Sequence, residues 1–223
     1  MRIKKIALSK LIVHTSLGRG RVQDISIMNQ SNEHGRMMLA LELDERIELQ
    51  TVLRLNGTTV DVQLPDGRKL FVGICTDITF EEQNGYKIIR LEVHSYSYIM
   101  DVTPVSQTYQ SPTKKLGDVV NELTARHGGS YRIAKDSAVP TVLYQQNETD
   151  WTFMKRLANQ YQQEVYVDVQ SQGVSVAIGA YSRKSYPTNI PMQQTGIHKD
   201  IGELRLVLGN EDPAAASYQY VTE

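Results

Sequence analysis

The sequence predicts a mainly β protein in which a compact α+β unit is inserted between β regions. Tyrosine accounts for 12 of the aromatic residues, against three Phe and one Trp, and tyrosine favours half-buried sheets and interfaces. Residues 50–98 alternate apolar and polar side chains between turn signals, as in an antiparallel meander. Near residue 110 the apolar period changes from 2 to 3.6, and it returns to 2 beyond the second helical stretch.

Composition excludes several classes of protein. The 223 residues carry 24 Lys+Arg and 25 Asp+Glu, and this net charge of −1 argues against a dedicated nucleic-acid binder. Cys75 is the single cysteine, so no disulfide framework can form. Mean hydropathy is −0.36, and no run approaches the ~18 apolar residues of a membrane span. Lys10 and His14 interrupt the apolar stretch of the basic N-terminus, which we expect to be a first strand rather than a signal peptide.

Three turn signals divide the meander. Asn56-Gly57 lies between residues 53–55 and 60–64 and predicts a type I′ hairpin. Pro65-Asp66-Gly67 marks a second turn, and Asn84-Gly85 marks a third.

The third turn predicts a register that can be checked. With Asn84-Gly85 as the two turn residues, the facing pairs are Phe80 with Ile89, Ile78 with Leu91, and Thr76 with Val93. Glu82 then lies opposite Lys87, which is an attractive pair. Asp77 lies opposite Glu92, which is unfavourable and leaves room for a bulge.

Two helices follow. For the first, Ser111 is the expected N-cap, Pro112 the first helical residue, and Gly128-Gly129 the end. Its apolar stripe is Leu116, Val119, Val120 and Leu123. The second helix is expected over residues 149–161, with an apolar side formed by Trp151, Met154, Leu157, Ala158 and Tyr161.

Short strands are expected around this unit at residues 141–144, 164–169 and 174–178. Alternation returns at residues 203–208, and residues 217–221 begin another strand. Because the chain ends inside this strand, we expect either a truncated chain or a sheet that another subunit completes.

The residues predict no catalytic, metal-binding or cofactor-binding site. The five histidines are far apart, neither H-E-x-x-H nor C-x-x-C occurs, and Glu33-His34 is expected to lie in a surface loop. Gly18-Arg19-Gly20 lacks the third glycine of a phosphate cradle. Cys75 is the best candidate nucleophile, because the register above places it opposite His94, but no oxyanion hole or orienting residue accompanies the pair.

One segment resembles a known signature. Residues 144–158 contain the pattern E-x-D-[WF]-x-F-x-x-R-L, formed here by Glu148, Asp150, Trp151, Phe153, Arg156 and Leu157. This pattern resembles that of phage tail baseplate hub proteins, a family that includes late control protein D and the hub portion of the type VI secretion spike protein VgrG. Four further segments resemble the family in the same order: Asn32–Arg36, Leu70–Ile74 with its F-x-G pattern, Ser95–Ser97, and Tyr109–Ser111.

The match departs from the family at two places. Gln162-Gln163-Glu164 stands where the family often has a glycine before an aromatic strand. Family members also continue through a second complete barrel and often a spike or a cell-wall hydrolase, so neither spike nor lysis activity is expected of these residues.

The resemblance implies an antiparallel β-barrel over residues 1–105, an inserted α+β unit over 106–182, and further barrel strands over 183–223. It implies a structural protein, a homotrimer whose tandem barrels form a pseudo-six-fold ring that joins a hexameric tail tube to a spike. Such a hub assembles in the bacterial cytoplasm as part of a virion tail or tail-like particle, without cofactors, specific nucleic-acid binding or membrane insertion. In the signature, we expect Trp151, Phe153 and Leu157 to pack, and Glu148 and Asp150 to favour the helix N-terminus.

Two alternatives from other classes remain. The chain could be a monomeric binding or adaptor module, which its mass in solution would reveal. It could also be a tail-associated cell-wall hydrolase, whose activity would depend on Cys75 and His94.

Overall fold

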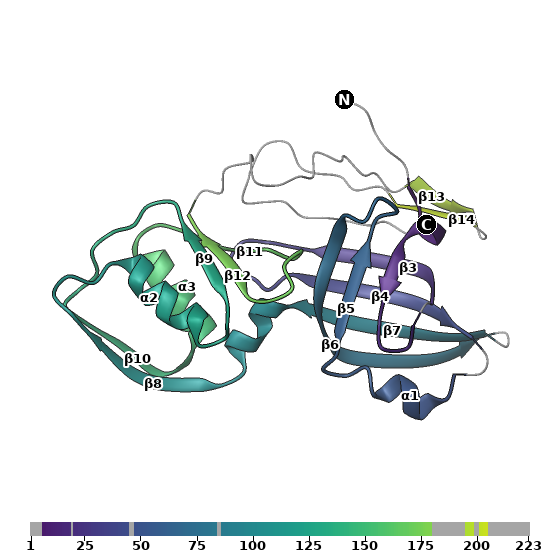
Figure 1. The fold of residues 1–223 in the computed structure, drawn as a ribbon, viewed down its shortest axis with the longest axis horizontal. Coiled ribbons are helices and arrows are strands. Elements are labelled where there is room, and N and C mark those ends of the chain that lie inside the picture. Colours follow the sequence, from purple (N-terminus) through teal and green to yellow (C-terminus); the bar gives the residue numbers. More distant parts are fainter. Residues whose placement is uncertain are drawn as a thin grey trace.

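The structure is a computed structural model that describes residues 6–18, 20–44, 47–83, 86–179, 195–198 and 201–204. The fold is mainly β: an antiparallel sheet curls into a half-barrel, and a smaller unit with two helices lies beside it (Figure 1). A 3₁₀ helix, η2 (Tyr96–Asp101), leads from one to the other.

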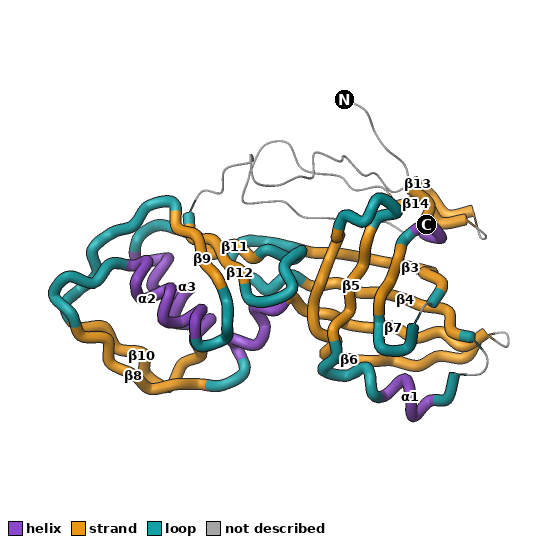
Figure 2. Tube along the Cα trace, viewed as in Figure 1, coloured by secondary structure: helices purple, strands orange, loops and turns teal. Residues whose placement is uncertain are grey.

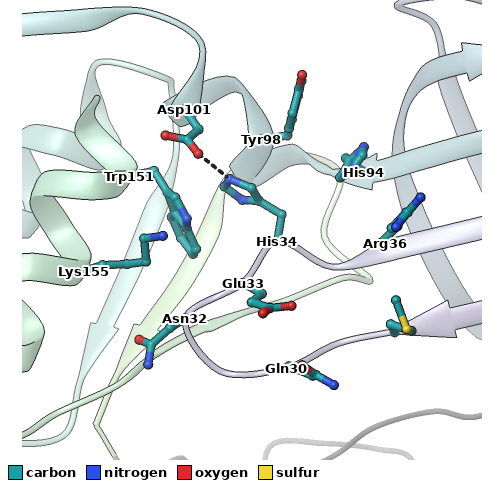
Figure 3. Close-up of a pocket in the computed structure, with 11 residues that line it drawn as sticks. Gln30, Asn32, Glu33, His34, Arg36, His94, Tyr98, Asp101, Trp151 and Lys155 are labelled. Atoms are coloured by element: carbon teal, nitrogen blue, oxygen red, sulfur yellow. Dashed lines mark hydrogen bonds and ion pairs between the residues drawn. The ribbon is translucent and has the colours of Figure 1, made fainter. Parts of the chain in front are cut away.

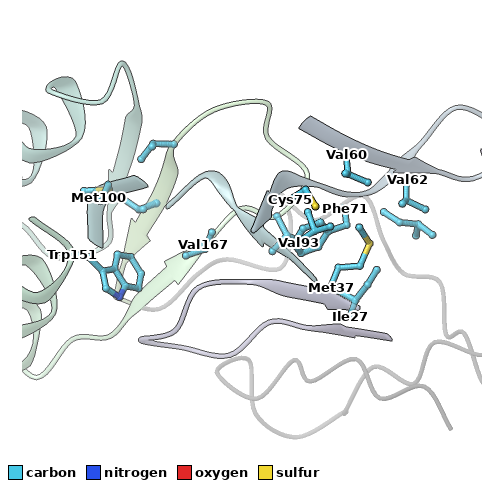
Figure 4. Close-up of a cluster of buried hydrophobic side chains, with 14 of the residues drawn as sticks. Ile27, Met37, Val60, Val62, Phe71, Cys75, Val93, Met100, Trp151 and Val167 are labelled. Carbon is cyan, nitrogen blue, oxygen red and sulfur yellow. The ribbon is translucent and has the colours of Figure 1, made fainter. Parts of the chain in front are cut away.

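Six strands form the half-barrel. Their order in the sheet is β2 (Ile12–His14), β5 (Thr59–Gln63), β6 (Lys69–Gln83), β7 (Tyr86–Ser95), β4 (Arg36–Leu43) and β3 (Arg21–Met28). All neighbours are antiparallel. Figure 2 shows these strands and the loops that connect them. Alternate side chains line the concave face, among them Val60, Val62 and Phe71, each 0% exposed. This apolar cluster continues towards Val167 and Trp151 of the helical unit (Figure 4).

The predicted register of β6 and β7 is confirmed near their turn and wrong further away. Phe80 faces Ile89, Ile78 faces Leu91 and Glu82 faces Lys87, as predicted. Beyond the Asp77–Glu92 pair a bulge at Thr76 shifts the register by one residue, so that Cys75 faces Val93. The expected Cys75–His94 pair is therefore wrong, and Thr76 Oγ1 lies 2.9 Å from His94 Nδ1 instead. Residues 84–85 lie outside the described residues.

The hairpin predicted at Asn56-Gly57 is also wrong. Residues 53–55 are not a strand; the chain forms the short helix α1 (Leu49–Leu53) and then turns towards β5. The helical turn buries Val52 and Leu55, both 0% exposed, which an extended strand with period 2 could not do. Gly57 adopts φ +77° and its N–H donates to the Cys75 carbonyl at 2.8 Å. The turn at Gly67 is confirmed, with φ +82° and a 2.9 Å bond to the Leu64 carbonyl.

The helical unit is built from two small sheets around two helices. Strands β8 (Pro104–Gln110) and β10 (Val142–Thr149) form one antiparallel ribbon. Strands β11 (Val165–Val167), β12 (Ser175–Ile178) and β9 (Ser130–Ile133) form the other, in which β9 and β12 are parallel. Helices α2 (Leu116–Ala125) and α3 (Asp150–Gln160) lie between them (Figure 1).

The predicted helices are present, with one wrong boundary. The first begins at Leu116 with Lys115 as its N-cap, not at Ser111. Residues 114–116 instead bond the backbone of 137–139, and the Asp118 carboxylate accepts the Lys115 N–H at 2.8 Å. The helix ends near the predicted glycines, where Gly128 adopts φ +63°. The second helix agrees within a residue at each end, and the Thr149 hydroxyl accepts the Thr152 N–H.

A third, small sheet joins the two ends of the described chain. It has the order β1 (Ile6–Ala7), β14 (Ile201–Leu204) and β13 (Thr195–His198), and the 3₁₀ helix η1 (Leu8–Lys10) follows β1. Residues from 205 onwards lie outside the described residues. They include most of the strand expected at 203–208 and all of the strand expected at 217–221. The helices of the described part are not long and apolar enough to cross a membrane.

Candidate functional site

Segments that lie far apart in the sequence meet where the half-barrel contacts the helical unit. His34 comes from the loop between β3 and β4, Asp101 from η2, and Trp151 from the first turn of α3 (Figure 3). Ser97 also belongs to η2. We call these four residues the junction. The junction thus brings together three of the segments that resemble the hub family, Asn32–Arg36, Ser95–Ser97 and the signature itself.

Hydrogen bonds and ring contacts hold the junction together. His34 Nδ1 lies 2.8 Å from Ser97 Oγ, and His34 Nε2 lies 3.4 Å from Asp101 Oδ2. The His34 ring is 4.3 Å from the Trp151 ring, centroid to centroid, at a tilt of 33°. The Asp101 carboxylate also accepts hydrogen bonds from the hydroxyls of Thr149 and Thr152 at the start of α3. One imidazole and one carboxylate therefore connect the sheet loop, η2 and α3.

Burial keeps the His34 imidazole neutral. The side chain is 12% exposed, and burial lowers its pKa from 6.5 to about 4, although the hydrogen bond and charge of Asp101 act in the opposite direction. Nearby positive charge on Lys155 lowers the pKa further. Because a carboxylate only accepts hydrogen bonds, we assign the single ring proton to Nε2, which leaves Nδ1 to accept from Ser97. Glu33-His34 lies in a loop as expected and Glu33 is exposed, but the His34 side chain points inwards and is an internal contact.

A pocket of about 300 Å³ opens beside the junction. The Lys155 ammonium lies 5.7 Å from the centroid of the Trp151 ring. On the opposite side, His94 stacks on Tyr98 with centroids 4.8 Å apart, and burial lowers the pKa of His94. The pocket is lined by Met28, Gln30, Asn32, Glu33, His34, Arg36, His94, Tyr98, Asp101, Trp151 and Lys155.

The junction does not have the properties of a catalytic triad, although its order Ser97–His34–Asp101 resembles one. Ser97 is 1% exposed and shares its hydroxyl with Ser95 at 2.8 Å, so a substrate has no access to it. A histidine with a pKa of about 4 is also a poor general base near neutrality. Within the described residues, no group of three or more His, Cys, Asp or Glu side chains could hold a metal ion.

Cys75 also lacks the properties of a nucleophile. Its side chain is buried, and burial raises the pKa of the thiol to about 11. The hypothesis of a Cys75–His94 pair also fails on geometry, since the bulge places Val93 opposite Cys75.

Five of the six signature residues lie on α3, and Glu148 lies near the end of β10. Trp151, Phe153 and Leu157 are at most 1% exposed. Arg156 donates to the Glu148 carboxylate, with Nε 3.2 Å from Oε2, and to the Tyr144 carbonyl at 2.7 Å.

Asp150 is the centre of a buried polar cluster that the sequence reasoning missed. Its carboxylate, 3% exposed, accepts from Arg126 Nη1 at 2.8 Å, His127 Nε2 at 3.0 Å and Gln145 Nε2 at 2.8 Å. Tyr109 donates to Gln145 Oε1 at 2.9 Å and accepts from Arg126 at 2.7 Å. The position of Asp150 at a helix N-terminus was visible in the sequence, but its partners come from β10 and from the turn that follows α2.

Two glycines permit close backbone approaches around the junction. A Cβ on Gly73 would lie 2.2 Å from the carbonyl oxygen of His94 on the next strand. A Cβ on Gly35 would lie 2.2 Å from Val169 Cγ1, which belongs to the segment after β11. The F-x-G pattern therefore combines a buried Phe71 with a position at which no side chain fits.

The fold is mainly β with a curled antiparallel sheet, and the comparison with family models identifies the family of the chain. The model of the phage tail baseplate hub (GPD) family matches residues 33–203, and the chain belongs to this family. A search of curated protein sequences finds no match.

Solved structures of tail proteins share the fold. A tail protein from Neisseria meningitidis has a TM-score of 0.59 at 13% identity, over 80% of this chain and 52% of its own. The 43 kDa tail protein of prophage MuSo2 from Shewanella oneidensis has a TM-score of 0.61 at 14% identity, over 77% and 55%. The E. coli c3393 protein, a type VI secretion component similar to phage T4 tail proteins gp27 and gp5, has 0.60 at 12%, over 76% and 48%. The chain spans about half the length of these three proteins.

Proposed function

We propose that this chain forms part of a homotrimeric hub that joins a hexameric tail tube to a spike in a contractile tail or tail-like injection system. The observation that carries the proposal is the match of residues 33–203 to the baseplate hub family. A trimer meets six tube subunits most simply when each copy presents two similar surfaces, which is the arrangement of tandem barrels. The tube and spike partners rest on the family alone.

The composition of the chain is compatible with a permanent assembly. A net charge of −1 causes little repulsion between copies. An obligate interface of this kind buries over ~2,000 Å², and aromatic residues are enriched in it. Tyr86 and Tyr144, 60% and 63% exposed, are available for such contacts.

We infer a structural role for the signature. Its buried members pack α3, Asp150 neutralises Arg126 inside the unit, and Glu148 and Arg156 attach α3 to β10. The proposal also includes a division of the chain into three parts, residues 1–105, 106–182 and 183–223. It further includes assembly in the bacterial cytoplasm.

The test is the mass of the purified chain in solution. Light scattering at tens of micromolar should give three times the 25.2 kDa of one chain. A strictly monomeric mass would favour the adaptor module and contradict the hub. A peptidoglycan-release assay on the same sample should show no activity; measurable hydrolysis would contradict the non-enzymatic role.

A further inference from the structure

The outer edge of β8 has no partner in the part of the chain that the structure describes. The ribbon contains only β10 and β8, so β8 has a strand on one side alone. No backbone hydrogen bond to residues 104–110 occurs there apart from the ladder with β10. Figure 1 shows β8 along the outer rim of the helical unit. Its outward N–H and C=O groups are therefore free to pair with another strand.

Apart from Pro104 at its first residue, β8 also lacks the features that usually protect an edge. Soluble proteins keep edge strands short, charge them or cover them, because an open edge recruits other strands. Residues 104–112 carry no charged side chain, and β8 is seven residues long.

The other edges in the described residues are protected. Strands β2 and β11 have three residues each, β13 has four and β1 has two. β9 carries Arg132, and β3 carries Arg21 and Asp24. On the β10 side of the ribbon, the Arg156 guanidinium already bonds the Tyr144 carbonyl at 2.7 Å.

The edge is also held in a defined position. Tyr109, 2% exposed, stacks on Phe153 with ring centroids 5.3 Å apart and is bonded by Arg126 at 2.7 Å. A strand that is already ordered loses little conformational entropy on pairing. Val102, two residues before β8, is 61% exposed, so a strand added to β8 could also cover apolar surface.

We propose that the outer edge of β8 pairs with an extended segment of a neighbouring copy of this chain. The proposal rests on the trimeric hub above. An uncharged edge offers no charge pattern by which to select a foreign partner, whereas copies of net charge −1 repel each other little. In a three-fold ring the contacts between copies are head-to-tail, so β8 of one copy must pair with a segment other than β8 in the next copy. Three such contacts close the ring and use each β8 edge once.

The experiment compares two double variants of equal charge. Thr108→Lys with Gln110→Lys places two lysines on the exposed side of β8, and Asn159→Lys with Gln160→Lys places two on the exposed side of α3. None of these four side chains takes part in a hydrogen bond within the described residues. Emission of Trp151, the single tryptophan, verifies that each variant is folded.

We expect wild type and the α3 variant to be trimers, and the β8 variant to dissociate with a Kd raised at least about tenfold. Hydrogen exchange of the amides in 105–110 should be slow in the trimer and fast in the dissociated variant. A trimeric wild type with an equally trimeric β8 variant overturns this inference and leaves the hub intact. Equal dissociation of both variants also overturns it, because charge alone then explains the loss. A monomeric wild type contradicts the hub and the edge contact together.

Discussion

Acidification should weaken the junction, because His34 fits there only as a neutral ring. Its pKa is about 4 in the folded protein against 6.5 for an ordinary histidine. The stabilisation is therefore complete above about pH 6.5, declines as the pH falls from 6.5 towards 4, and changes no further below that. The unfolded chain takes up a proton in this window that the folded chain does not.

The size of the effect follows from the same two values. Between pH 7 and pH 4.5, this single group should reduce the free energy of unfolding by about 2 kcal/mol. No large discount for solvent is needed, since the side chain is 12% exposed. The Asp101 carboxylate, His94 and Lys155 also act on this site, so the effect is best isolated by comparison with a variant that lacks the imidazole.

The assay is urea unfolding of wild type and His34→Asn at pH 7 and at pH 4.5, followed by the emission of Trp151. Asparagine keeps a polar side chain but does not titrate, so the free energy of unfolding of this variant falls less on acidification. The variant is less stable than wild type at both pH values. The stability difference between the two proteins should shrink by about 2 kcal/mol at the lower pH. An unchanged difference would refute the assignment of His34 as a buried neutral group.

Further predictions concern other parts of the fold. Gly73→Ala should destabilise the half-barrel by at least about 2 kcal/mol in urea unfolding, because its Cβ meets the His94 carbonyl; a change below about 0.5 would contradict the close approach. Asp150→Asn should cost about 3 kcal/mol, because it leaves Arg126 without its buried carboxylate, and a loss equal to that of an exposed control would refute this role. Cys75 should resist thiol reagents in the folded protein at pH 8 and react fully in urea, since its pKa is about 11; rapid native labelling would contradict its burial.

Local patterns predicted most of the secondary structure. The 3.6 period and the Thr149 cap predicted α3 within a residue, because both signals belong to the helix itself. Period-2 alternation predicted the facing pairs of β6 and β7 near their turn. It failed beyond Thr76, since a bulge depends on how two strands fit and shifts every later pair by one residue.

Where local sequence signals competed, tertiary packing decided which local structure formed. Asn56-Gly57 is a strong hairpin signal, yet burial of Val52 and Leu55 under the sheet favours a helical turn there. Ser111 is a good N-cap by type, but bonds between residues 114–116 and 137–139 delay the helix to Leu116.

The sequence by itself determined the class of fold, the presence of two helices after the β meander, the absence of a disulfide framework and, through its signature, the family. Only the tertiary structure decided that His34 is an internal contact of Trp151, 117 positions further along the chain. It also decided that the Asp150 carboxylate accepts hydrogen bonds from Arg126 and His127, and that β8 has a strand on one side alone within the described residues. The physical reason is that periodicity and caps are properties of neighbouring residues, whereas burial, pKa and an unpaired edge depend on residues that only folding brings together.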